Sequence, residues 1–70
     1  MIKWGVIGTG HMANIFAESI QETDNAKLVA VSSRTKKSLE IFGDRFNVKE
    51  NLRFISNEEI CKSKDIDAIY

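Results

Sequence analysis

The residues with the clearest capacity for chemistry form the hexapeptide Gly8–Ala13, which directly follows a short apolar run. Gly8 can make a tight turn, and Gly10 has no Cβ to keep a pyrophosphate away from the backbone. Ala13 takes the third place of this G-x-G-x-x-A pattern and is small enough for a helix to pack closely on a sheet. A helix N-terminus offers unpaired N–H groups and about half a positive charge, so it can bind phosphates without a lysine. The hexapeptide predicts a dinucleotide site; the alternative is that its glycines are only turn residues.

The end of a second apolar run, residues 27–32, indicates which dinucleotide is bound. In sites selective for NAD, an Asp or Glu stands roughly 20 residues past the glycines and binds the ribose hydroxyls. Here Ser33 and Arg34 stand at that place. A serine hydroxyl can donate to a 2′-phosphate, and a guanidinium can pair with it or stack on adenine. Lys37 adds a flexible positive charge, so we favour NADP(H) over NAD(H); the alternative is that these basic residues are only a solvated helix start.

Other reactive side chains are few. The chain has a single cysteine, Cys61, and a single histidine, His11, which excludes an intramolecular disulfide and a zinc site of Cys and His ligands. We expect Cys61 to be a small apolar filler rather than a nucleophile, because no base is identifiable near it. We expect the imidazole of His11 to lie at the solvent edge of the loop without a catalytic role.

The charged residues are balanced, with ten Lys and Arg against ten Asp and Glu. No net field therefore favours nucleic acid or an anionic membrane as a partner. No apolar run approaches the roughly 20 residues that span a bilayer. Residues 2–7 are too short for a signal-peptide core and are not followed by a cleavage site. These features predict a cytoplasmic globular protein whose partner is a small molecule.

The apolar residues near the start of the chain predict a strand, a helix and a second strand. Residues 2–7 and 27–32 are short apolar runs typical of buried strands, and the first of them suggests a strand covered on both faces. From His11 the apolar period becomes that of a helix ending near residues 23–25. Its apolar stripe comprises Met12, Ala13, Phe16, Ala17 and Ile20.

A second amphipathic helix is expected over residues 36–46. Thr35 can cap its start. Its stripe comprises Leu39, Phe42, Gly43 and Phe46. A glycine costs about 1 kcal/mol relative to alanine within a helix, so the sequence supports the last turn, which contains Gly43, less strongly than the earlier turns.

The remaining elements complete one half of a doubly wound sheet. Residues 53–55 predict a third strand, the S-x-x-E capping box at Ser56 opens a short helix to about Lys62, and residues 65–70 begin a fourth strand. Right-handed crossovers then give an α/β fold, a Rossmann-type parallel sheet with strand order 3-2-1-4. Because strand four has barely begun at Tyr70, we expect residues 1–70 to be a truncated N-terminal part of a dinucleotide-binding domain.

Three segments, Ile2–Ala13, Val29–Arg34 and Asp65–Tyr70, closely resemble the N-terminal domain of the oxidoreductase family of glucose-fructose oxidoreductase, inositol dehydrogenase and MocA. The resemblance covers essentially the whole chain. It implies a two-domain enzyme in which a C-terminal α/β domain supplies most of the substrate site and the interface of a homo-oligomer. The implied reaction is hydride transfer between a nicotinamide cofactor and a sugar, inositol or related polyol or keto substrate.

The resemblance also implies roles for individual residues. Thr9, His11 and Met12 would contact the pyrophosphate, and Ser33, Arg34 and Thr35 would meet the adenosine end of the cofactor. The family's catalytic lysine, in a Glu-Lys-Pro segment, and its later Asp and His would lie beyond the end of this chain. We therefore expect no catalytic residue here. The alternatives are a sensor or regulatory module that binds NAD(P) without turnover, and a structural fragment without a function of its own.

Overall fold

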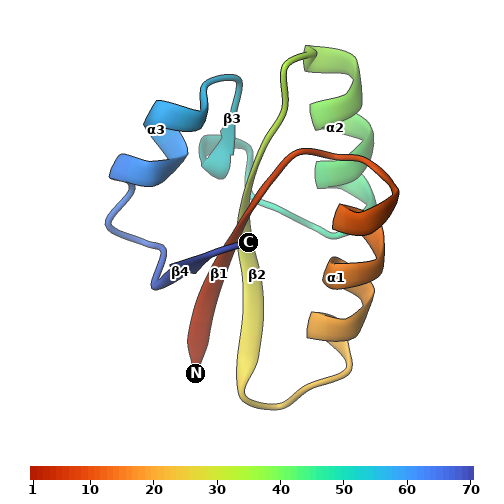
Figure 1. The fold of residues 1–70 in the computed structure, drawn as a ribbon, viewed down its shortest axis with the longest axis vertical. Helices are drawn as coiled ribbons and strands as arrows, with labels where there is room; N and C mark the ends of the chain where they lie inside the picture. Colours follow the sequence, from red (N-terminus) through yellow and green to blue (C-terminus); the bar gives the residue numbers. More distant parts are fainter.

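A parallel sheet of four strands forms the centre of the computed structural model, which describes residues 1–70 (Figure 1). The strands are β1 (Ile2–Ile7), β2 (Ala26–Ser32), β3 (Arg53–Phe54) and β4 (Ala68–Ile69). They lie in the order β3-β2-β1-β4, and every pairing is parallel. The predicted α/β class and strand order are confirmed. Since the strands are parallel, their carboxyl ends meet at one edge of the sheet.

Helices cover both faces of the sheet. The helices α1 (His11–Gln21) and α2 (Lys36–Arg45) lie on one face, and the short helix α3 (Asn57–Lys62) lies on the other (Figure 1). A 3₁₀ turn, η1 (Glu50–Leu52), leads into β3. None of the helices is both long enough and apolar enough to cross a membrane.

The main hydrophobic core lies between the sheet and the layer formed by α1 and α2. The apolar stripes of the two helices supply much of it, as their period predicts. Its buried members are Val6, Ala13, Ala17, Ile20, Leu28, Val31, Leu39, Phe42, Phe46 and Val48. On the opposite face, Ile60 of α3 is fully buried. A Cβ on Gly5 would lie 3.0 to 3.3 Å from side-chain atoms of Ile66 and Ile60, so this glycine allows close packing on β1.

The predicted second helix forms, and its last turn contains Gly43. The helix continues through Gly43 to Arg45, and the side chain of Arg53 fills the space beside the glycine. A Cβ on Gly43 would lie only 2.7 Å from Cδ of Arg53. The Arg53 Nε donates to the Val48 carbonyl (2.9 Å), and its Nη1 lies 3.1 Å from Asp44 Oδ1. Gly43 is therefore a packing site for an arginine from the neighbouring strand.

Both predicted helix caps form. The Oγ1 of Thr35 accepts from the backbone N–H of Ser38 (3.4 Å), and the Oγ of Ser56 accepts from that of Glu58 (3.1 Å). The donor at the second cap is thus one residue earlier than Glu59, the position that the capping-box pattern names.

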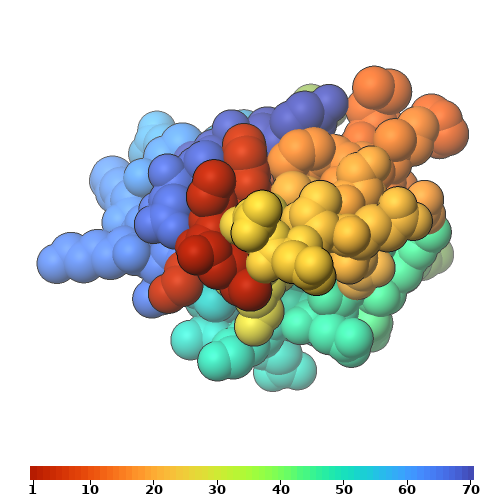
Figure 2. Space-filling model, turned by 90° about the horizontal axis from the view of Figure 1, so that it is seen from below, coloured from red at the N-terminus to blue at the C-terminus, as the bar shows by residue number.

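Two burial predictions are wrong. Strand β1 is covered on both faces only in its centre, because Ile2 and Ile7 at its ends are exposed. Seen from below, the start of β1 reaches the surface beside the connection from α1 to β2 (Figure 2). Cys61 is exposed and is not an apolar filler. The preceding residue, Ile60, takes the helix position facing the sheet, and one step along a helix turns the next side chain by about 100°.

Candidate functional site

A cleft lies where the carboxyl ends of β1 and β2 run into α1 and α2, at the upper end of the molecule in Figure 1. In open parallel sheets, ligands bind at this edge where the strand order reverses. The order reverses at β1, which lies between β2 and β4. The cleft has a volume of about 610 Å³ and is lined by Ile7, Gly8, Thr9, Gly10, Ser33, Arg34, Thr35, Ser38 and Asn57.

The two glycines of the loop suit their positions for different structural reasons. Gly8 has φ = 99°, a conformation that side chains with a Cβ rarely adopt, and its N–H donates to the carbonyl of Ser32 (2.8 Å). Gly10 has φ = −78° and ψ = −170°, which any residue can adopt. Apart from Gly10 and its two chain neighbours, no residue has an atom within 4 Å of the position of a Cβ on Gly10. The fold does not need a glycine at position 10, so the open space beside it suits a ligand that approaches the backbone.

The N-terminus of α1 opens at this cleft. Its N-cap is Gly10, which has no side chain to cap the helix, and no acidic residue lies in the first turn. The first N–H groups of a helix have no acceptor within it, and the partial positive charge at this end favours an anion. Arg34 is the one charged residue in the lining. The electrostatic environment therefore suits a pyrophosphate.

Ser33 joins the segments that surround the cleft. It is only 8% exposed, and its Oγ lies 3.3 Å from Thr9 Oγ1. The same Oγ accepts from the backbone N–H of Thr35 at 3.4 Å. The Ser33 N–H donates to the Phe54 carbonyl at 3.0 Å. The hydroxyl predicted to meet a 2′-phosphate is thus fixed between the loop after β1 and the start of α2.

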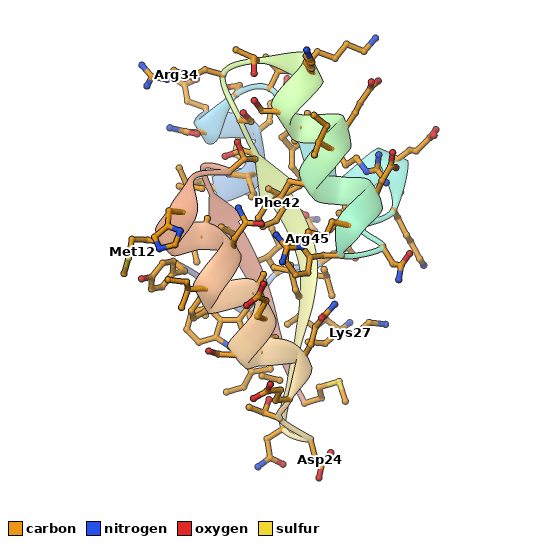
Figure 3. The ribbon with its side chains drawn as sticks, turned by 90° about the vertical axis from the view of Figure 1, so that its right-hand side faces the viewer. Met12, Asp24, Lys27, Arg34, Phe42 and Arg45 are labelled. Carbon is orange, nitrogen blue, oxygen red and sulfur yellow. The ribbon has the colours of Figure 1, made fainter.

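The basic residues after β2 differ in position. Arg34 lines the cleft, and its exposed side chain extends from the upper end of the molecule (Figure 3). Lys37 is exposed and does not line the cleft. Arg34 is therefore the better placed of the two for a phosphate in the cleft.

Residues 2–70 match the model of the Gfo/Idh/MocA family, oxidoreductases with an NAD-binding Rossmann fold. The chain belongs to this family. An uncharacterized oxidoreductase of Escherichia coli K12, YgjR, is 40% identical over 70 residues, which cover 100% of this chain. The chain spans 21% of the length of that relative. The expected Rossmann oxidoreductase is thereby confirmed at the level of the family.

Solved structures agree with the family assignment. The myo-inositol dehydrogenase of Lactobacillus casei, in complex with NAD(H) and myo-inositol, is 28% identical with a TM-score of 0.86, over 99% of this chain and 20% of that one. A 3-ketoreductase of Actinomadura kijaniata, in complex with NADP, shares the fold at 23% identity and a TM-score of 0.86, over 99% of this chain and 21% of that one. One fold thus accommodates either cofactor and does not by itself decide between them.

Most of the predicted site residues of this Gfo/Idh/MocA chain lie together. Those that line the cleft are Gly8, Thr9, Gly10, Ser33, Arg34 and Thr35. His11 and Met12 are exposed in the first turn of α1, and Figure 3 shows Met12 on its outer side. Ala13 is buried against the sheet, where a larger residue would separate the helix from it. Like these three residues, Lys37 does not line the cleft.

Ser38 and Asn57 line the cleft but are absent from the sequence-based prediction. Ser38 lies one turn after Thr35 in a helix that starts at the cleft. Asn57 follows β3, and its Oδ1 accepts from the Oγ of Ser32 (2.9 Å). The rule that carboxyl ends of parallel strands share one edge could have identified both positions.

The lining of the cleft has none of the side chains that usually transfer protons. It has no His, Lys, Asp, Glu, Cys or Tyr side chain, which are the usual general acids and bases. No cluster of three His, Cys, Asp or Glu residues could hold a metal ion. The arrangement is suited to binding and orienting a ligand.

Proposed function

We propose that this chain is the N-terminal, cofactor-binding part of an oxidoreductase that transfers a hydride between a nicotinamide cofactor and a sugar, inositol or related polyol or keto substrate. The observation that carries the proposal is the open space at Gly10, beside an uncapped helix N-terminus. The loop would hold the pyrophosphate through backbone N–H groups. A bound nicotinamide would supply the hydride chemistry, and the remaining chain would supply the substrate site.

The chain's own residues would bind and orient the cofactor. Gly10 lets the pyrophosphate approach the start of α1, and Ser33 and Arg34 would meet the adenosine ribose. The absence of a carboxylate at the end of β2 supports NADP(H) as the preferred cofactor. A 2′-phosphate there would gain a hydroxyl and a guanidinium partner, and no negative side chain in the lining opposes it.

The substrate class is inferred from the family. The myo-inositol dehydrogenase of L. casei supports a polyol substrate, since its structure combines the same fold with myo-inositol and NAD(H). A module that binds NAD(P) without turnover is the second candidate, because the lining of the cleft has no acid or base.

An activity assay on the native-length protein tests the proposal. The protein is incubated with NADP⁺ or NAD⁺ and a panel of inositols and sugars, and with the reduced cofactors and keto sugars, while the nicotinamide absorbance is followed. We expect turnover with at least one polyol or keto sugar. Tight cofactor binding without turnover across the panel would favour the regulatory module, and absence of cofactor binding would contradict both functions.

A further inference from the structure

The carboxamide of Asn14, in the first turn of α1, has its polar atoms engaged on both sides. Its Nδ2 donates to the carbonyl oxygens of Thr9 (3.2 Å) and Gly10 (2.9 Å). Its Oδ1 accepts from Nη1 of Arg45 (2.8 Å). The reverse orientation of the amide would set its oxygen against two carbonyl oxygens, so these partners determine its orientation. Asn14 therefore bridges the loop after β1 and the last turn of α2.

This bridge acts on the peptides that would face the pyrophosphate. A trans peptide directs its C=O and its N–H to opposite sides. Because the carbonyls of Thr9 and Gly10 point to Asn14, the N–H groups of Gly10 and His11, in the same two peptides, point away from it. Both belong to the first N–H groups of α1, which have no acceptor within the helix. The backbone N–H of Asn14 also donates to the Gly10 carbonyl (3.1 Å), so the helix helps to orient the second peptide, whereas the Thr9 carbonyl is held by the Asn14 side chain. The direction of both N–H groups is set before any ligand arrives.

Arg45 in turn holds Asn14. Its guanidinium forms an ion pair with Glu18 of α1 and lies 5.0 Å from the centre of the Phe46 ring. Figure 3 shows Arg45 between α1 and α2. The side chains of Arg45 and Glu18 are 53% and 52% exposed, so their ion pair adds little stability of its own. Its consequence is a guanidinium fixed beside the Asn14 carboxamide.

We propose that Asn14 is a positioning residue for the dinucleotide, and that Arg45 sets its carboxamide. The inference rests on the proposed function, since it assigns the orientation of a pyrophosphate donor, the Gly10 N–H, to the Asn14 side chain. A loop that is oriented in advance loses less conformational freedom when the ligand binds. Asn14 would act on the pyrophosphate, the part that NADPH and NADH share, and not on the adenosine end where they differ.

Calorimetric titration of the native-length protein tests whether Asn14 positions a pyrophosphate donor. The ligands are NADPH, NADH and adenosine 2′-monophosphate, of which the last has no pyrophosphate. Asn14→Leu keeps the size of the side chain and removes both N–H donors. We expect its dissociation constants for NADPH and NADH to rise by the same factor, about tenfold, or about 1.4 kcal/mol. The constant for adenosine 2′-monophosphate should stay unchanged. Ser19→Ala, an exposed position of α1 without a side-chain hydrogen bond, is the matched control.

Arg45→Met supplies a second test that leaves the loop contacts of Asn14 in place. We expect a smaller loss for both dinucleotides, and no further loss when Arg45→Met is added to Asn14→Leu, because the two act through one contact. Unchanged dinucleotide binding in Asn14→Leu would overturn the proposal. So would a parallel loss of adenosine 2′-monophosphate, which would indicate general damage to the fold. If the wild type binds neither dinucleotide, the proposed function itself fails.

Discussion

Gly8 and Gly10 belong to the same loop, yet the backbone conformation requires a glycine at only one of them. Gly8 has a positive φ, whereas Gly10 has an ordinary extended conformation with open space where a Cβ would lie. The G-x-G spacing predicts both positions from the sequence but not this difference, which depends on the folded dihedral angles. Function and fold can therefore be separated by mutation.

Gly10→Val should abolish or strongly weaken cofactor binding in a protein that remains folded. The chain leaves open space at the position of the Cβ, and an apolar N-cap typically costs about 1 kcal/mol relative to glycine, whereas a bound pyrophosphate would meet the new methyl groups. Gly8→Ala is the contrasting variant and should lower the free energy of unfolding by about 1–2 kcal/mol. Thermal unfolding and calorimetry measure the two effects. Unchanged affinity in folded Gly10→Val would show that the loop does not approach the phosphates.

Ser33→Asp should shift the cofactor preference from NADPH toward NADH. A carboxylate there would repel the 2′-phosphate and offer an acceptor to a ribose diol. A charge-assisted hydrogen bond contributes about 1.5–3 kcal/mol, and about 1.4 kcal/mol is tenfold in affinity, so the ratio of the two dissociation constants should change at least tenfold. Titrations at low and moderate salt should show the stronger salt dependence for NADPH.

Two outcomes would remove the basis for NADP(H) selectivity. One is equal affinity of the wild type for both cofactors, and the other is an unaltered ratio in Ser33→Asp. Lys37→Ala is the control, because Lys37 does not line the cleft and should affect the ratio less than Arg34→Ala. The sequence predicted that the residues directly after β2 lie at the cleft, and Ser33, Arg34 and Thr35 line it. The contact of Ser33 with Thr9 was not, since it depends on how two segments 24 residues apart meet.

At the scale of elements, α2 contains a glycine that packs against an arginine. Gly43→Ala should destabilise the protein although alanine favours a helix by about 1 kcal/mol. The added methyl would displace Arg53 from its contacts with Val48 and Asp44, and overpacking costs about 1–3 kcal/mol. In an Arg53→Ala background the same substitution should become neutral or stabilising. Urea unfolding of the four variants measures the coupling, and additive effects would contradict it.

The apolar periods predicted the helices and the longer strands, because each period reflects burial on one face. They failed for contacts that depend on the order of the strands. Phe16 stacks on Tyr70 with ring centroids 3.9 Å apart, and Trp4 meets Phe16 edge-on at 5.2 Å. Tyr70 reaches Phe16 because β4 lies beside β1, and Trp4 reaches it because α1 packs on β1. The irregularity between Trp4 and Gly5 in the pairing with β2 has no local sequence signal either.

At the scale of the whole molecule, a protein made of these 70 residues alone should show no dehydrogenase turnover. The lining of the cleft offers hydroxyls, an amide and a guanidinium but no general acid or base, and proton transfer must accompany the hydride in alcohol oxidation. The chain and the native-length protein should be assayed in parallel with NADPH and keto sugars. Turnover that copurifies with the 70-residue chain through several independent steps would contradict this expectation.

The central claim, that the cleft at the carboxyl ends of β1 and β2 holds a dinucleotide, is tested most directly by a crystal structure of the native-length protein with NADPH. We expect pyrophosphate oxygens at about 2.7–3.2 Å from backbone nitrogens of the Gly8–Ala13 loop, and the adenosine ribose beside Ser33 and Arg34. A cofactor bound at another place, or an empty loop at a saturating concentration of NADPH, would contradict the claim.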